Sequence, residues 1–312
     1  MKYSLGIIGI ILAIGSLGCS QPFALKVSDI DYEALGSGRL FVSSTNLQQS
    51  YYIDVDAKEA FYVPMSDGFA VDGAGKFIYT ISGRDIYRAE IGGFKWEKLP
   101  HQLPRGSTSN FGVSPDNQKL YFIWVDVING NQPLVSLDLE TGEITDLMPL
   151  SDFEIARCSV NPVSGEIAFL VQNIQDSTLH FYRMQGDGSE LELLFSEDLE
   201  TRPNSLPYNV MNWTADGKEI VYMLTGEEYI FRYNLASNTK SEMPFYQDLN
   251  YFNASTRIAF SPDGERFVYG LLESVIVENW DQNRKSYGYD RKTITSFCEY
   301  SCYTAGKVYW WP

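Results

Sequence analysis

The histidines and cysteines of the chain are its residues best suited to metal binding or nucleophilic catalysis. His101 and His180 are far apart, and neither has a ligand-type spacing to another histidine or cysteine, which argues against a zinc site. The sequence also lacks the Gly-x-Ser-x-Gly motif of a serine nucleophile elbow. We therefore expect no metal, no cofactor and no catalytic residue.

The cysteines have different predicted uses. Cys298 and Cys302 are close enough in sequence to join across a tight bend, but spacing alone does not fix disulfide geometry, so a bridge and two thiols remain alternatives. Cys158 falls in a predicted strand, where a thiol packs as a small buried hydrophobe.

Pairs of acidic residues resemble the carboxylates of a glycan-active enzyme. Asp54 with Asp56, and Asp138 with Glu140, each follow an apolar strand. Other segments carry Asn, Ser, Thr or Gly at the same place, and these residue types share the ability to form turns. We interpret the acidic pairs as turn residues, with a carboxylate-based enzyme as the less favoured alternative.

These turns belong to a repeat that organises the whole chain. Its clearest copy is 258–269, an apolar run, the turn Ser-Pro-Asp-Gly and a second alternating run, which is typical of two tightly joined antiparallel strands. Copies recur roughly every 45 residues, the period expected of four-stranded propeller blades. Aligned on the residue before the second strand, they are centred on Gly38, Gly75, Gln118, Gly165, Gly217, Gly264 and Gly306.

The motif resembles the repeat of the TolB-type, WD-repeat-like β-propellers, and the resemblance extends over residues 31–312. It implies an all-β propeller that serves as a non-enzymatic protein-interaction platform at the cell envelope. A small-molecule or glycan-binding module at the mouth of the channel is the main alternative.

The repeat count predicts seven blades of mostly four-stranded antiparallel sheets. The segments 293–298 and 307–311 would supply two strands of the seventh blade, and the spare apolar segment 23–28 would complete it by joining the two ends of the chain. Such closure hides sheet edges. The alternative is a six-bladed ring that leaves about the last 20 residues outside.

Four polar residues stand seven or eight positions before the repeat centres, where the chain enters the innermost strands. They are Asn110, Arg157, Asn209 and Arg257. In a propeller such positions converge on one mouth of the central channel, so the arginines could hold a carboxylate of a ligand or partner loop. Pairing of each arginine with a local acid is the alternative.

The first 30 residues differ from the rest of the chain. An apolar, glycine-rich run ends in Gly18-Cys19-Ser20, and it is too short to cross a bilayer, for which about 20 residues are needed. It resembles a bacterial lipobox, which implies that Cys19 is lipidated and that Ser20 directs an exported protein to the outer membrane if the host is Gram-negative. Ser16 departs from the lipobox pattern, which prefers leucine, so an ordinary signal peptide is the alternative. We expect a signal peptide at 1–18, a tether or closing strand at 19–30 and the propeller at 31–312.

Composition excludes one class of partner. Asp and Glu number 40 against 24 Lys and Arg, giving a formal net charge of −16. Nucleic-acid binding relies on Lys and Arg to neutralise phosphates, so we expect neither DNA nor RNA as a partner. We expect membrane contact through the N-terminal lipid alone, and an envelope protein as the partner.

Overall fold

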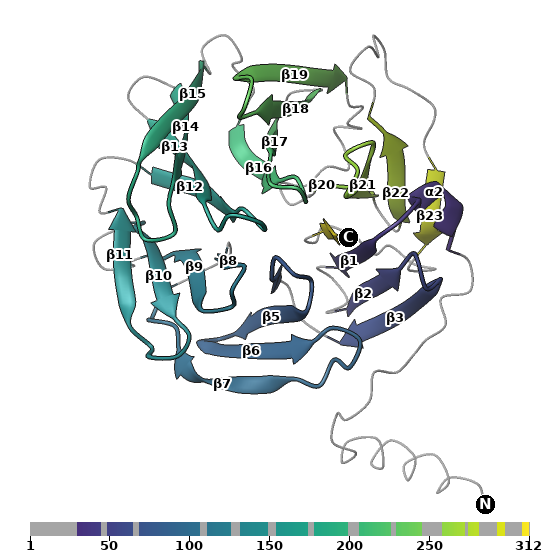
Figure 1. The fold of residues 1–312 in the computed structure, drawn as a ribbon, viewed down its shortest axis with the longest axis horizontal. Helices are drawn as coiled ribbons and strands as arrows, with labels where there is room; N and C mark the ends of the chain where they lie inside the picture. Colours follow the sequence, from purple (N-terminus) through teal and green to yellow (C-terminus); the bar gives the residue numbers. More distant parts are fainter. Residues whose placement is uncertain are drawn as a thin grey trace, which may run out of the picture.

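The protein is a six-bladed β-propeller, which confirms the predicted architecture and corrects the predicted count of seven blades. The computed structural model describes residues 30–44, 49–64, 69–106, 111–125, 132–148, 154–173, 178–198, 206–225, 229–244, 258–271, 274–280, 292–296 and 308–311. Within these ranges the strands form six antiparallel sheets of four strands, and the sheets surround a central channel (Figure 1).

We number the blades along the chain and give their strands from the channel outwards. Blade 1 consists of β24 (Val308–Trp311), β1 (Arg39–Ser44), β2 (Gln49–Asp54) and β3 (Glu59–Pro64). Blade 2 consists of β4 (Phe69–Val71), β5 (Phe77–Ser82), β6 (Asp85–Glu90) and β7 (Glu97–Gln102). Blade 3 consists of β8 (Phe111–Val113), β9 (Lys119–Ile123), β10 (Leu134–Asp138) and β11 (Ile144–Met148).

The other three blades also follow chain order. Blade 4 consists of β12 (Glu154–Val160), β13 (Ile167–Asn173), β14 (Thr178–Met184) and β15 (Glu192–Asp198). Blade 5 consists of β16 (Leu206–Trp213), β17 (Glu219–Thr225), β18 (Tyr229–Asn234) and β19 (Thr239–Pro244). Blade 6 consists of β20 (Ile258–Phe260), β21 (Arg266–Leu271), β22 (Ser274–Asn279) and β23 (Lys292–Ser296). A short helix, α2 (Tyr32–Leu35), precedes β1.

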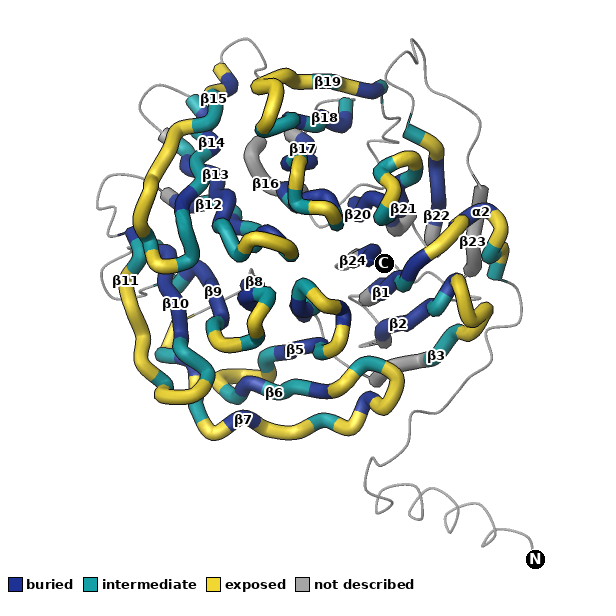
Figure 2. The backbone as a smooth tube through the Cα atoms, in the orientation of Figure 1, coloured by how far each residue is buried: buried dark blue, intermediate teal, exposed yellow. Residues whose placement is uncertain are grey.

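The position of a strand within its blade determines its burial. The β20 residues Ile258 to Phe260 are all buried, because both faces of an inner strand lie against neighbouring blades. Outer strands such as β11 and β19 expose at least half of their residues (Figure 2). Apolar runs therefore mark the inner strands, and polar ones mark the rim of the ring.

The core consists of layers between neighbouring blades. Six buried apolar clusters occur in the described part of the chain, one for each pair of adjacent blades. Between blades 4 and 5, for example, the ring centroids of Phe181 and Tyr222 are 4.7 Å apart. Between blades 6 and 1, Val268 packs in one cluster with Leu40 and Trp310. The ring is therefore closed by the same kind of contact that joins its other blades.

The two ends of the chain close the ring within a single blade, and this explains the wrong count. β24 pairs with β1, with Val42 opposite Val308 and Leu40 opposite Trp310. The repeat copies at Gly38 and Gly306 are therefore two strands of blade 1 rather than two blades. The predicted strand 293–298 corresponds to β23, the outer strand of blade 6. The C-terminal strand lies inside the ring, contrary to the expected six-bladed alternative, and the proposed closing segment 23–28 is outside the described residues.

Candidate binding site

A polar side chain anchors the turn between the first and second strands of blades 2 to 6. Its oxygen accepts backbone N–H groups further along the turn, which provides them with hydrogen-bond partners. The distances run from 2.6 Å, between Lys76 N and Asp72 Oδ1, to 3.1 Å, between Glu219 N and Thr214 Oγ1. The anchoring residues are Asp72, Ser114, Asn161, Thr214 and Ser261.

These turns gather at one end of the channel, where side chains connect blade 2 to blade 3, blade 4 to blade 5 and blade 5 to blade 6. Four donors reach a neighbouring blade over 2.8 to 3.0 Å: Asn117 Nδ2 to Asp72 Oδ2, Asn161 Nδ2 to the Gly217 carbonyl, Trp213 Nε1 to the Ser159 carbonyl and Asn212 Nδ2 to the Ile258 carbonyl. In blade 1, where the chain ends meet, Trp310 Nε1 donates to the Ser37 carbonyl at 2.9 Å. We call this end of the channel the turn end.

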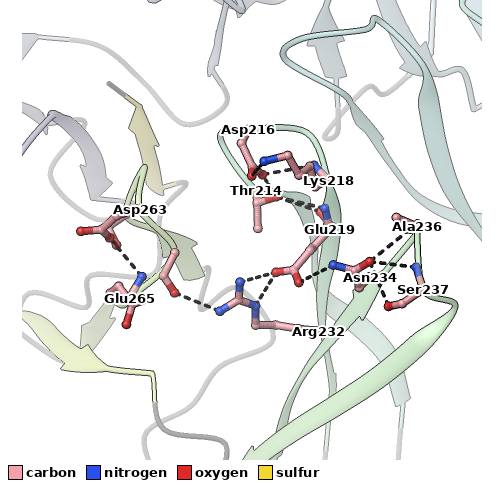
Figure 3. Close-up of polar contacts among 12 residues, drawn as sticks. Thr214, Asp216, Lys218, Glu219, Arg232, Asn234, Ala236, Ser237, Asp263 and Glu265 are labelled. Atoms are coloured by element: carbon pink, nitrogen blue, oxygen red, sulfur yellow. Dashed lines mark hydrogen bonds and ion pairs between the residues drawn. The ribbon is translucent and has the colours of Figure 1, made fainter.

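An arginine makes a second connection between blades 5 and 6. Arg232 forms an ion pair with Glu219 of its own blade and donates from Nη1 to the Gly264 carbonyl of the next blade at 2.9 Å (Figure 3). Its guanidinium also lies 5.0 Å from the ring centroid of Phe260 and 5.1 Å from that of Trp280. The turn end is thus a preorganised surface, because hydrogen bonds restrain the turns that form it.

A cavity of about 80 Å³ opens among these turns. Strand ends and turns of blades 1, 2, 4 and 5 line it, and its lining residues include Asp72, Asn212, Ala215, Trp213, Trp310 and Trp311. The turn of blade 2 crosses to that of blade 4, since a Cβ on Gly73 would lie only 1.9 Å from the Pro162 carbonyl oxygen. Residues distant in sequence therefore form one small pocket on the channel axis.

The three indoles of the cavity are held firmly. Trp213, Trp310 and Trp311 are between 5% and 8% exposed. Trp311 packs against Gly75, where a Cβ would lie 2.0 Å from the indole Nε1, and the φ of +64° at this position also favours glycine. Trp311 Nε1 is buried at this contact, with no acceptor in the described part of the chain. The indoles thus provide fixed aromatic walls.

The residues predicted to bind at the channel lie in different places. Arg157 is in the middle of β12, where its Nη1 donates to the Ala156 carbonyl at 3.1 Å, and Asn209 is in β16. Asn110 and Arg257 are outside the described residues, as are Cys19, Cys298 and Cys302. The structure therefore leaves the predicted arginine site as a prediction, and the cavity lies at the opposite ends of the inner strands.

The acidic pairs are turn residues, as expected. Asp54 Oδ1 accepts from Ala57 N at 2.8 Å, and Asp138 Oδ1 accepts from Thr141 N at 2.7 Å. Hydrogen bonds from the Thr141 backbone and side chain hold the pKa of Asp138 below its ordinary value, which keeps the carboxyl ionised. Cys158 is buried in the core between blades 3 and 4, also as expected.

The histidines do not form a catalytic centre with their neighbours in the described structure. His101 Nε2 lies 2.9 Å from the Glu140 carbonyl oxygen. His180 Nδ1 lies 2.8 Å from Ser196 Oγ, but the two are cross-strand neighbours on β14 and β15, away from the channel, and no described carboxylate orients the ring.

Burial raises the pKa of Tyr121 to about 12, so this phenol stays protonated. Nowhere in the described ranges do three or more His, Cys, Asp or Glu side chains gather as a metal site requires.

Comparison with solved structures identifies the fold. No family model matches the chain, and no characterised protein matches its sequence. TolB from Acinetobacter baumannii has a TM-score of 0.61 at 18% identity, over 88% of this chain and 66% of that one. The fold is that of a TolB-type β-propeller. The Nidogen/Laminin complex gives 0.61 at 15% identity over 88% and 98% of the two chains, and hydrazine synthase of Kuenenia stuttgartiensis gives 0.53 at 15% over 84% of each.

These similarities establish the fold of the chain and leave its activity open. The chain spans just under two thirds of the length of the Acinetobacter TolB. A helix able to cross a bilayer is not found in the part of the chain that the structure describes.

Sequence reasoning missed the residues that line the cavity. Trp310 and Trp311 pack in cores between blades and also line the cavity, and the sequence analysis did not single them out. It also treated every Asp-containing turn alike. Aligning the repeats on the residue that anchors the turn would have singled out Asp72, because the equivalent positions of blades 3 to 6 carry Ser, Asn, Thr and Ser.

Proposed function

We propose that the protein is an exported, lipid-anchored envelope protein that binds another protein without catalysing a reaction. The observation that carries this proposal is the aromatic cavity at the turn end of the channel. A rigid scaffold that presents such a pocket reduces the ordering cost of recognition. The resemblance to TolB-type propellers, and the similarity to a propeller of the Nidogen/Laminin complex, support a protein partner.

The chemistry of the described residues supports binding over catalysis. Carboxyl groups with a shifted pKa all shift downward and therefore stay ionised at neutral pH, whereas a general acid needs a raised pKa. The tyrosines with a shifted pKa all have a raised pKa, chiefly because burial disfavours the ionised phenolate. These shifts follow from turns and burial, so they carry no sign of a tuned catalytic group.

The size of the cavity favours a protein partner over a free small molecule. Pockets for drug-sized ligands occupy roughly 300–1,000 Å³. A volume of about 80 Å³ instead suits one side chain of a partner segment. The remaining contact would come from the surrounding turns, which are exposed around the channel (Figure 2).

Filling the cavity tests this proposal. Ala215 lines the cavity and lies in the first turn of blade 5, so Ala215→Leu should obstruct it. Ala236, in another turn of the same blade, is exposed and distant from the cavity lining, so Ala236→Leu is the matched control (Figure 3). Partners are captured by cross-linking to the lipidated wild-type protein in its native envelope. We expect Ala236→Leu to capture the same partners as the wild type and Ala215→Leu to lose them. Equal cross-linking by two variants that melt like the wild type would refute binding at the turn end.

A further inference from the structure

Asp72 brings a buried charge to a turn that needs none in the other blades. It is 3% exposed. Ser114, Asn161, Thr214 and Ser261 anchor the equivalent turns with neutral oxygens. Turn geometry therefore accounts for an oxygen acceptor at position 72 but leaves its negative charge unexplained.

In the described part of the chain, the donors to the Asp72 carboxylate are all neutral. Oδ1 accepts from Lys76 N at 2.6 Å and Phe77 N at 3.0 Å, and Oδ2 accepts from Asn117 Nδ2 at 2.8 Å. The ammonium group of Lys76 lies instead 5.0 Å from the ring centroid of Phe77. Within the described ranges no Lys, Arg or His forms an ion pair with Asp72. Buried charges in proteins are normally paired, so this one suits a cation supplied from outside.

The cavity beside Asp72 provides the other requirements of a cation site. Among the residues that the structure describes, its lining includes three tryptophans and no Lys, Arg or His. Indole is the best aromatic partner of a cation, and the interaction strengthens when water is excluded. The formal net charge of −16 further attracts cationic groups and repels anionic ones.

We infer that the cavity takes the ammonium or guanidinium group of a Lys or Arg side chain on the partner. This inference rests on the proposed function, because it specifies the chemistry of the partner segment that enters the turn end. Asp72 provides the charge, while Trp213, Trp310 and Trp311 enclose the alkyl stem and the cationic group. An acidic side chain would be rejected by the same carboxylate.

Neutralising Asp72 while keeping the turn is the decisive change. Asp72→Asn is close to isosteric, and Asn161 already anchors the turn of blade 4. In the Asp72→Asn variant, the new side-chain amide could disturb Asn117, which donates to Asp72 in the wild type. Asp72→Ser is therefore a second variant, because it reproduces the serine anchors of blades 3 and 6. Asp216→Asn removes the same charge from an exposed carboxylate that pairs with Lys218 and is outside the cavity lining, so it is the matched control.

The probes are the peptides acetyl-Gly-Lys-Gly-amide and acetyl-Gly-Arg-Gly-amide, with norleucine and Glu peptides of the same design as neutral and acidic comparisons. Binding is measured by titration of the indole N–H signals of Trp213, Trp310 and Trp311 in NMR spectra of the whole mature protein. We expect the Lys and Arg peptides to shift these signals, with affinity at least tenfold weaker in Asp72→Asn and Asp72→Ser and unchanged in Asp216→Asn. Norleucine binding as tightly as Lys, or equal affinity in folded Asp72 variants, would overturn the inference.

The two proposals fail in different ways. If Ala215→Leu abolishes capture of the partner while the neutral peptide binds best, the turn end binds the partner but the occupant is not cationic. If the Lys peptide binds through Asp72 while Ala215→Leu retains the partner, the cation site exists but the partner binds elsewhere.

Discussion

Arg232 illustrates how single residues hold adjacent blades together. It is partly buried, with 15% of its side chain exposed, and its partner Glu219 is 19% exposed. Its Nη1 bonds to blade 6 at the Gly264 carbonyl, while its Nε donates to Glu219 at 2.7 Å within blade 5. The same side chain therefore forms an ion pair within one sheet and a hydrogen bond to the next sheet.

Replacing Arg232 with methionine should destabilise the protein by about 2–3 kcal/mol. The change leaves Glu219 without its cation and the Gly264 carbonyl without its donor, and leaving partly buried groups unsatisfied costs more than losing an exposed pair. The matched control is Arg183→Met, whose pair with Glu192 is more exposed, at 32% and 53%, and should cost under about 1 kcal/mol. Urea unfolding of both variants measures the difference, and equal losses would contradict the assigned role of Arg232.

The stability contribution of Asp263 should depend on pH. Burial disfavours its ionised form, but hydrogen bonds from Ser261 and from the Glu265 N–H, together with Arg266, outweigh burial and hold the pKa of Asp263 below its ordinary value. A carboxyl group whose pKa is lowered by folding stabilises the folded protein at pH values above its unfolded pKa of about 3.9. This stabilisation is lost as the pH falls through the pKa of the folded state. The wild type should therefore exceed Asp263→Asn in unfolding free energy at pH 6, and the difference should shrink towards pH 3. Denaturant titrations at both pH values test this, and a constant difference would contradict it.

Residue-level prediction from the sequence was uneven for physical reasons. The roles of Asp54 and Asp138 were predictable because turn chemistry is local. The cavity was not, because it joins residues about 240 positions apart, such as Asp72 and Trp311, which only ring closure brings together.

At the scale of elements, β24 closes the ring. Its pairing with β1 covers an inner edge that would otherwise be exposed, and it places Trp310 and Trp311 in two different cores between blades.

Removing residues 307–312 should therefore lower the melting temperature by roughly 10 °C or more, since each buried tryptophan contributes about 3–5 kcal/mol. Removal of Pro312 alone keeps β24 and should change little. Calorimetry of the two truncated proteins compares them directly. Similar melting temperatures for the longer truncation and the wild type would show that β24 is dispensable for closure.

The strand pattern was predictable and the number of blades was not. Local alternation and the Ser-Pro-Asp-Gly turn define each hairpin, because they depend on neighbouring residues. The pairing of Val42 with Val308 depends on which strand completes an interrupted sheet. Two strand-like copies at opposite ends of a chain give the same local signal whether they begin two blades or share one.

At the scale of the whole molecule, closure and charge act together on binding. Closure brings β24 of blade 1 and the turns of blades 2, 4 and 5 around one cavity. The formal charge of −16 makes the protein acidic as a whole, which should accelerate its association with a cationic segment, and this acceleration should weaken as salt is added.

The last prediction concerns where this binding surface is held. Residue 19 is outside the described structure, and the apolar run that ends in Gly18-Cys19 predicts its lipidation. Acyl chains on Cys19 would confine the propeller to a membrane surface, because two lipid signals anchor a protein stably whereas one does not. We expect the wild type to enter the detergent phase on Triton X-114 partitioning and Cys19→Ala to be released into the soluble fraction. The control Cys158→Ala, which changes a buried propeller cysteine, should partition like the wild type. An uncleaved apolar segment could also retain Cys19→Ala at the membrane, so the deciding measurement is the mass of the N-terminal peptide. A lipidated peptide that starts at Cys19 would support the anchor, and an unmodified N-terminus downstream of residue 19 would contradict it.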